Sequence, residues 1–130
     1  MNLDPNPSGK ASDVRIDPAF GEWVLRTIRD GLRPRFVICL GLKGKSDAIK
    51  LLERVFDDFH AAKPHADYPL ECYEKKRLRF REWNCVGSTG NQIKLVMWPQ
   101  HPSQPPFSSL ETWRGACREF AGRHCGLIRP

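Results

Sequence analysis

The sequence predicts an α/β fold, a three-layer α/β/α arrangement with a small, mostly parallel sheet. Three observations predict it: apolar residues recur at helical spacing in three segments, two short apolar runs are typical of buried strands, and these segments alternate along the 130 residues. The expected order is helix, strand, helix, strand, strand, helix. Residues 1–15, rich in proline and poor in apolar groups, are expected to form a flexible lead-in, and residues 16–130 a single domain.

The first helix is expected to begin at Pro18. Asp17 is a favourable N-cap, and proline suits the first helical position because its missing N–H would have no partner there. Gly31 and Pro34 are expected to stop the helix. The apolar positions that follow Pro18 at helical spacing are Phe20, Trp23, Val24, Ile28 and Leu32.

A buried strand and a second helix come next. The run from Phe36 to Leu40 ends at Gly41 and is nearly continuously apolar, as in a strand covered on both faces. Ser46 is expected to cap the second helix, and Pro64 to end it. The apolar stripe of this helix consists of Ile49, Leu52, Val55, Phe56 and Phe59.

Two further strands are expected to pair as a hairpin. Residues 65–74 are loop-like, and the segment from Arg77 to Trp83 then alternates charged with apolar residues, as a strand exposed on one face does. The segment Gly87–Asn91 predicts a turn, and Ile93 to Trp98 predicts a second buried strand.

A last helix follows the proline-rich loop from Pro99 to Pro106. Ser108 and Glu111 have the spacing of a capping box, which predicts a helix start. The residues expected to face inward on this helix are Leu110, Trp113, Cys117 and Phe120. We expect Trp23, Trp83 and Trp113 to pack in the core rather than to stack on nucleic-acid bases.

Composition narrows the classes of function. The net charge of +6 favours an anionic partner, chiefly nucleic acid, because Lys and Arg displace the counterions held by phosphates. No apolar run approaches the ~20 residues that cross a bilayer, so no membrane contact and a cytoplasmic location are expected. The five cysteines contain no Cys-x-x-Cys pair, and the spacing of Cys117, His124 and Cys125 matches no common zinc pattern, so no metal site is expected.

Two loops follow the two most apolar strands, Gly41–Ser46 and Gln100–Ser103, and are expected to lie side by side. The first resembles a phosphate-binding P-loop, but the Walker A motif needs a glycine where Cys39 stands. Two interpretations remain open. Either backbone amides with Lys43 or Lys45 contact a phosphate, or the segment is an ordinary turn between strand and helix.

His101 and the basic strand each have two interpretations. His101 has a proline on each side, which restricts the backbone, and an imidazole is a hydrogen-bond donor near neutral pH. The alternative is an ordinary surface residue of a loop. The basic run from Lys75 to Arg81 either contacts phosphates or protects an exposed edge strand from pairing with other chains, and the second interpretation is favoured.

Three features in this order resemble the carboxyl-terminal half of the uracil-DNA glycosylase superfamily. They are the segment Leu32–Gly41, the apolar strand that enters His101-Pro102-Ser103, and the helix with Trp113 and Phe120. The similarity covers roughly residues 18–124. Each motif is short, so their common order and spacing carry the resemblance.

The resemblance implies an enzyme that flips uracil out of DNA and cleaves its N-glycosidic bond without metal or organic cofactor. His101 would be the catalytic residue, donating a hydrogen bond to uracil O2 as negative charge builds on the departing base. Ser103 would hold a phosphate through its hydroxyl and its amide, and Pro102 and Gln104 would contact DNA beside it. Phe107 would serve as an intercalating wedge.

The chain also departs from the family pattern. The family's glycine-serine phosphate contact maps onto Gly41 and Leu42, so the serine hydroxyl is absent and Lys43 or Lys45 is expected to replace it. The motif that positions the attacking water and the segment that recognises uracil cannot be placed. Asp4 has too few preceding residues for a strand that would hold its carboxylate. The fold is therefore expected to be incomplete relative to the glycosylase fold.

We therefore expect a uracil-DNA glycosylase-like protein of base-excision repair, either a fragment of a longer enzyme or a shortened homologue, with uracil-containing or single-stranded DNA as its partner. The alternative is a non-catalytic α/β module that binds nucleic acid or a partner protein. A phosphate-binding enzyme built on Gly41–Ser46 is the third hypothesis. A truncated sheet would expose an apolar edge, so a homodimer or a protein partner is expected to cover it.

Overall fold

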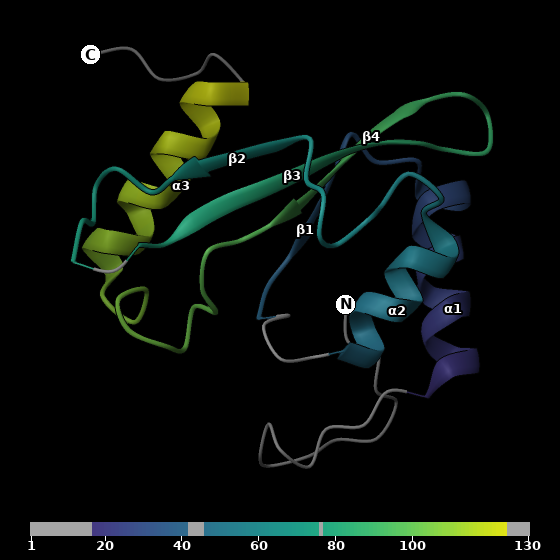
Figure 1. Cartoon of the computed structure of the whole chain (residues 1–130), viewed down its shortest axis with the longest axis horizontal. Coiled ribbons are helices and arrows are strands. Elements are labelled where there is room, and N and C mark those ends of the chain that lie inside the picture. The colour runs from purple at the N-terminus through teal and green to yellow at the C-terminus, as the bar shows by residue number, and fades with distance from the viewer. Residues whose placement is uncertain (1–16, 42–45, 76, 125–130) are drawn as a thin grey trace.

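The structure is a computed structural model that describes residues 17–41, 46–75 and 77–124 (Figure 1). The predicted lead-in, residues 1–15, lies outside this part of the chain. The elements are α1 (Pro18–Arg26), η2 (Thr27–Leu32), β1 (Phe36–Cys39), α2 (Ser46–Val55), β2 (Ala66–Pro69), β3 (Arg79–Val86), β4 (Gln92–Met97) and α3 (Leu110–His124).

The four strands form one sheet in the order β1-β4-β3-β2. β1 pairs with β4 in parallel, with Phe36 opposite Lys94, whereas the β4–β3 and β3–β2 pairs are antiparallel. The predicted α/β fold is confirmed, but the sheet is mixed rather than mostly parallel. The reason is the short turn between β3 and β4, closed by the Gly87 N–H on the Asn91 carbonyl at 2.7 Å, because so short a connection only joins antiparallel strands.

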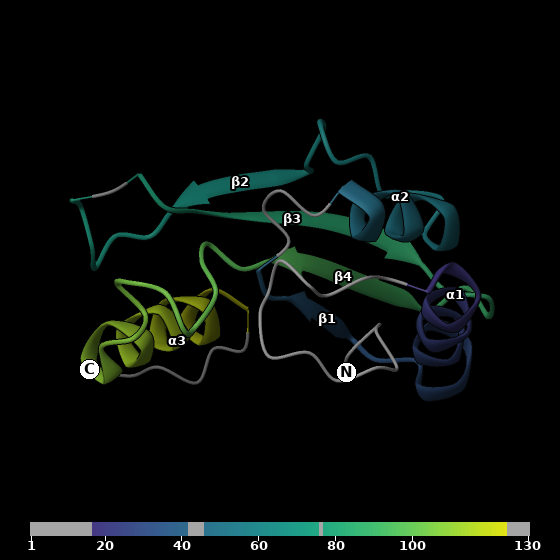
Figure 2. The same cartoon turned by 90° about the horizontal axis from the view of Figure 1, so that it is seen from below.

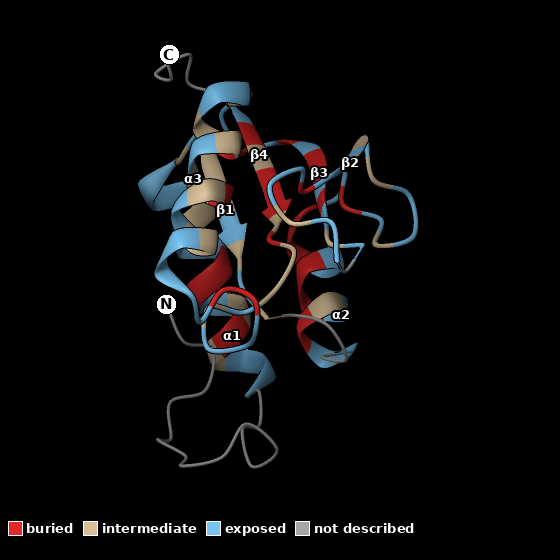
Figure 3. Ribbon diagram, turned by 90° about the vertical axis from the view of Figure 1, so that its left-hand side faces the viewer, coloured by how far each residue is buried: buried red, intermediate tan, exposed pale blue. Residues whose placement is uncertain are grey.

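Two hydrophobic clusters cover opposite faces of the sheet and produce the three layers. Figure 2 shows α1 and α2 at one end of the sheet and α3 at the other, and Figure 3 shows buried residues on the central strands β3 and β4 and on α1 and α2. The first cluster joins α1 and α2 to Trp83, Cys85, Ile93 and Leu95. The second joins α3 to Phe80, Val96, Trp98 and Phe107. Alternating side chains of β3 and β4 therefore serve both cores.

The start of α1 follows the prediction, and the helical segment ends between Gly31 and Pro34 as expected, but its last part, η2, is π-helical. The Asp17 side chain accepts a hydrogen bond from the Phe20 N–H at 3.0 Å, with Pro18 in the first turn. The helix passes through Gly31 in a π-helical segment and stops at Arg33, which has a left-handed φ of 47°. The Arg33 N–H donates to the Ile28 carbonyl, five residues back, at 3.1 Å.

Removing the N-cap is expected to weaken α1. Asp17→Ala leaves the Phe20 N–H without its acceptor and should lower the free energy of unfolding by about 1 kcal/mol. Urea denaturation followed by circular dichroism measures this. Asp17→Asn keeps an acceptor oxygen and should change stability by much less, so equal losses for the two variants would contradict the cap.

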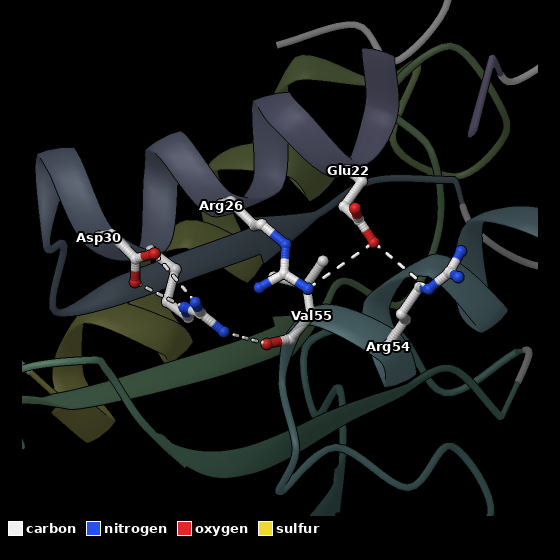
Figure 4. A network of polar contacts seen from close by, with 6 residues as sticks. Glu22, Arg26, Asp30, Arg54 and Val55 are labelled. Carbon is white, nitrogen blue, oxygen red and sulfur yellow. Dashed lines mark hydrogen bonds and ion pairs between the residues drawn. The ribbon is translucent and has the colours of Figure 1, made fainter. Parts of the chain in front are cut away.

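Polar contacts join α1 and η2 to α2 (Figure 4). The Arg29 guanidinium donates to the carbonyl of Val55, the last residue of α2, at 2.5 Å, and pairs with Asp30. Glu22 lies 3.7 Å from Arg26 and 3.3 Å from Arg54. Arg29 thus satisfies a carbonyl that the end of α2 leaves without a helical partner.

Trp23 is the clearest error in the predicted core. Its side chain is 63 % exposed, whereas Trp83 is fully buried and Trp113 is partly buried. The buried side of α1 consists of Gly21, Val24 and Leu25, so the helix is rotated relative to the expected stripe. Trp23 instead lies near the Phe20 ring, with 6.1 Å between centroids.

Two helix boundaries differ from those predicted. α2 ends at Val55, well before Pro64, yet Phe56 and Phe59 of the following segment remain buried in the core. α3 begins at Leu110, one residue later than the Ser108 capping box requires, so Ser109 precedes its first turn.

The edges of the sheet also differ from those expected. β2 lies in the segment predicted to be loop, and its Pro69 is tolerated because an edge strand leaves alternate N–H groups unpaired. β3 pairs with β2 on one side and β4 on the other, so the view that its arginines protect a free edge is wrong. The other edge is β1, where Ile38 is 43 % exposed. Whether a partner covers it stays a prediction.

Candidate functional site

The two loops that follow β1 and β4 touch at the rim of the sheet. A hydrogen bond from the Trp98 N–H to the Cys39 carbonyl, at 3.0 Å, joins the ends of these two strands, and each segment then leaves the sheet. Gly41 has a left-handed φ of 70°, and a Cβ on it would lie 2.8 Å from His101 Cδ2. The His101 imidazole therefore packs directly on the Gly41 backbone. Parallel neighbouring strands explain this convergence, because their carboxyl ends share one rim.

The His101 ring is held by hydrogen bonds within its own loop. The Ser103 N–H donates to Nδ1 at 3.0 Å, and Ser103 Oγ lies 2.7 Å from the same atom. An amide nitrogen can only donate, so Nδ1 is an acceptor and the proton of the neutral imidazole is on Nε2. Because the side chain is exposed, Nε2–H is a hydrogen-bond donor free to meet a ligand at the rim.

An aromatic cluster supports the loop from below. Trp98 lies 5.5 Å from Trp113 and 5.5 Å from Phe120 between ring centroids, which joins the end of β4 to α3. Phe107 packs against Trp98 and Trp113 and is only 3 % exposed. The expectation of an intercalating wedge at Phe107 therefore fails, since the side chain fills the core beneath the loop instead of protruding from it.

The remaining predicted site residues fall into two groups. Ser103 and Gln104 are exposed and Pro102 is partly buried, so all three lie on the surface of the His101 loop. The Gln104 N–H donates to the His101 carbonyl at 3.0 Å, which closes a turn around them. Residues 42–45, which include Lys43 and Lys45, lie outside the described residues, as does Asp4.

Cys39 precedes Gly41 by two residues but is not a reactive group. Burial raises the pKa of its thiol to about 12, so the sulfur stays protonated at neutral pH. A protonated thiol is a weak nucleophile. The chemistry of this rim therefore rests on the imidazole and the backbone amides around it.

The close contact between the loops makes Gly41 sensitive to substitution. Gly41→Ala would place a methyl group 2.8 Å from His101 Cδ2 and force a left-handed φ on a residue with a side chain. We expect a stability loss of about 1 kcal/mol and a displaced imidazole. Thermal denaturation measures the first, and the histidine ring signals in NMR the second. Gly90→Ala, at φ 80° with open space around it, carries the same backbone cost without moving His101.

A second polar cluster, missed in the sequence, lies on the α3 face of the sheet. Glu82 is 1 % exposed, and its Oε2 accepts hydrogen bonds from the Tyr68 hydroxyl and from His124 Nε2, the latter at 2.5 Å. Lys94 Nζ lies 3.5 Å from Oε1. Burial and the neighbouring carboxylate raise the pKa of Tyr68 well above its usual range. The sequence did contain a sign of this cluster, because Glu82 occupies a strand position that the alternating pattern assigns to apolar residues.

The Glu82 cluster joins the C-terminal end of α3 to three strands. The His124 ring also packs on Phe36 and Phe120, with centroids 5.5 Å and 4.7 Å away, which leaves it only 11 % exposed. Tyr68 is covered by the Arg123 guanidinium, 3.7 Å from the ring centroid. With its polar groups bonded to each other and its rings covered, the cluster is arranged to hold the helix rather than to receive a ligand.

Comparisons with known proteins give no relative: no family model, curated protein or solved structure matches the chain. Among the described residues, no helix is both long and apolar enough to cross a membrane. The same part of the chain contains no group of three or more His, Cys, Asp or Glu side chains that could hold a metal ion.

Proposed function

We propose that this protein binds DNA through the rim formed by Gly41 and the His101 loop and acts as a uracil-DNA glycosylase-like protein in base-excision repair. The observation that supports the proposal best is the exposed Nε2–H of His101, fixed by the Ser103 amide and seated on Gly41. A donor whose orientation is set before binding loses little entropy when a ligand arrives.

The chemistry of base removal matches such a donor. When the N-glycosidic bond of a flipped uracil breaks, the electron pair of the bond leaves with the base and negative charge appears on its carbonyl oxygens. A neutral imidazole stabilises that charge by donating through Nε2–H, an effect that amounts to a few kcal/mol in a pre-formed site. The exposed Ser103 hydroxyl and nearby Gln104 would hold the flanking phosphates. The proposal leaves the activation of water to a group that the resemblance does not place in this chain.

A strand-scission assay tests the proposal. A labelled single strand with one uracil is incubated with the protein and then treated with alkali, which breaks the strand where a base has been removed. We expect breakage at uracil and none in a matched strand with thymine at that position. An intact uracil strand at stoichiometric protein would remove the enzymatic proposal for this chain.

A second candidate, a non-catalytic module that binds nucleic acid or a partner protein, is favoured by the edge strand β1. Ile38 of β1 and Leu40 just after it are 43 % and 41 % exposed, and an edge strand can pair with a second copy or with another chain. Salt-sensitive retardation of an uncleaved strand would support nucleic-acid binding by such a module. A dimer in sedimentation would support a protein partner at β1.

A further inference from the structure

The start of β3 presents arginines on a part of the sheet face that no described helix covers. Alternation places Arg79 and Arg81 on the same face as Trp83 and Cys85. Trp83 and Cys85 are buried under α1 and α2, whereas both arginines are exposed. In Figure 2, α1 and α2 lie over the right-hand half of the sheet, and the left-hand parts of β2 and β3 extend beyond them.

The two arginines differ in how their charge is balanced. Arg79 Nε lies 2.5 Å from Asp67 Oδ1, and the Arg79 guanidinium also donates to the Asp67 carbonyl at 3.3 Å. Asp67 is the cross-strand neighbour of Arg81, yet its carboxylate is turned to Arg79. Among the described residues, no carboxylate lies within ion-pair distance of Arg81. Its charge is therefore available to an anion from outside.

Arg81 lies on the same end of the sheet as His101. It is paired with Met97 across β3 and β4, and Met97 precedes His101 by four residues. Since β4 lies between β1 and β3, the order across the rim is the Gly41 loop, the His101 loop and the start of β3. Because β3 has neighbours on both sides, edge protection does not account for an exposed arginine at this place.

We propose that Arg81 binds a backbone phosphate of a DNA single strand that crosses from the His101 loop over the open face of β3. This inference rests on the DNA binding of the proposed function and adds the path of the strand and the residue that grips it. A guanidinium fits this role because its planar donors can meet two phosphate oxygens at once. The uncovered face gives a single strand room beside the exposed charge.

The test is binding of a dye-labelled single strand that contains no uracil, followed by fluorescence anisotropy at several salt concentrations. Arg81→Gln should weaken binding about tenfold at low salt. The slope of log K against log salt should fall by about 0.7, as for the loss of one phosphate contact on a single strand. Arg81→Lys keeps the charge without the planar donors and should restore the salt slope but only part of the affinity.

Arg54→Gln is the matched control. It removes the same charge, but Arg54 is on α2 and pairs with Glu22 (Figure 4), so affinity should stay within about twofold of the parent and the salt slope should be unchanged. Equal effects of Arg54→Gln and Arg81→Gln, tighter binding to a duplex than to a single strand, or no binding at all would overturn the proposed path.

The outcome also separates this inference from the proposed function. Arg81-dependent binding without breakage at uracil would keep the strand path and remove the glycosylase. Breakage at uracil with unchanged affinity in Arg81→Gln would keep the glycosylase and remove the strand path. Thermal denaturation of each variant shows that the fold is intact, which the exposure of the Arg81 side chain leads us to expect.

Discussion

Glu82→Ala is expected to lower the free energy of unfolding by about 3–5 kcal/mol, a large part of the stability of a small domain. The substitution removes the acceptor shared by Tyr68, His124 and Lys94 while leaving those three groups in place. The part-buried Tyr68 hydroxyl and His124 Nε2 would then lack an acceptor, and a donor kept from water without an acceptor costs free energy. Urea denaturation followed by tryptophan fluorescence gives the free energy directly.

Two further variants make the Glu82 result specific. Glu82→Gln keeps an acceptor oxygen without the charge, so its loss should fall between that of Glu82→Ala and zero. Glu53→Ala removes an exposed carboxylate of α2 and should change stability by no more than about 0.5 kcal/mol. If Glu82→Ala cost less than about 1 kcal/mol, the cluster would not hold α3 to the sheet.

His101→Ala is expected to slow uracil removal by about 100- to 1000-fold, the usual cost of losing a donor to a developing anion. The fold should be unaffected because the side chain is exposed on a loop. Single-turnover cleavage of the uracil strand measures the rate. His101→Gln retains an N–H donor on a longer, less fixed side chain and should recover part of the rate.

His60→Ala provides the matched histidine control. Its side chain is exposed, and only its backbone carbonyl has a structural role, as the acceptor of the Trp83 indole N–H at 2.8 Å. The rate should therefore equal that of the parent. An equal rate for His101→Ala would show that the imidazole takes no part in any cleavage observed.

Periodicity predicted most of the fold because most elements are amphipathic. α2, α3 and the β3–β4 hairpin follow from apolar spacing and from the Gly87–Asn91 turn. β2 could not be found this way: it has four residues, includes a proline, and depends on its neighbour for its pairing. The prediction that Trp23 packs in the core was wrong for another reason. When a helix has apolar residues on two sides, tertiary packing decides which side faces the core.

The geometry at the rim was predictable, and the buried polar cluster was not. Two parallel strands with loops at their carboxyl ends require Gly41 and His101 to lie near each other. The sequence shows an acidic residue, Glu82, at an apolar position of the strand pattern. Its partners, however, come from β2, β4 and α3, and a single sequence does not show which segments meet. The position of Phe107 was equally hidden, because a phenylalanine in a loop is compatible with both a wedge and a core anchor.

The placement of Glu82 next to Trp83 on the central strand β3 has a consequence for how the chain avoids mispairing. Moving β3 by one residue relative to β4 would exchange the two faces, pressing the carboxylate into the cluster beneath α1 and α2 and turning the indole toward Lys94. A strand with only aliphatic residues at these positions would tolerate such a slip at modest cost. A single buried acid therefore penalises the misaligned sheet far more than the native one, and the same side chain that fastens a helix also selects the correct alignment of the strands.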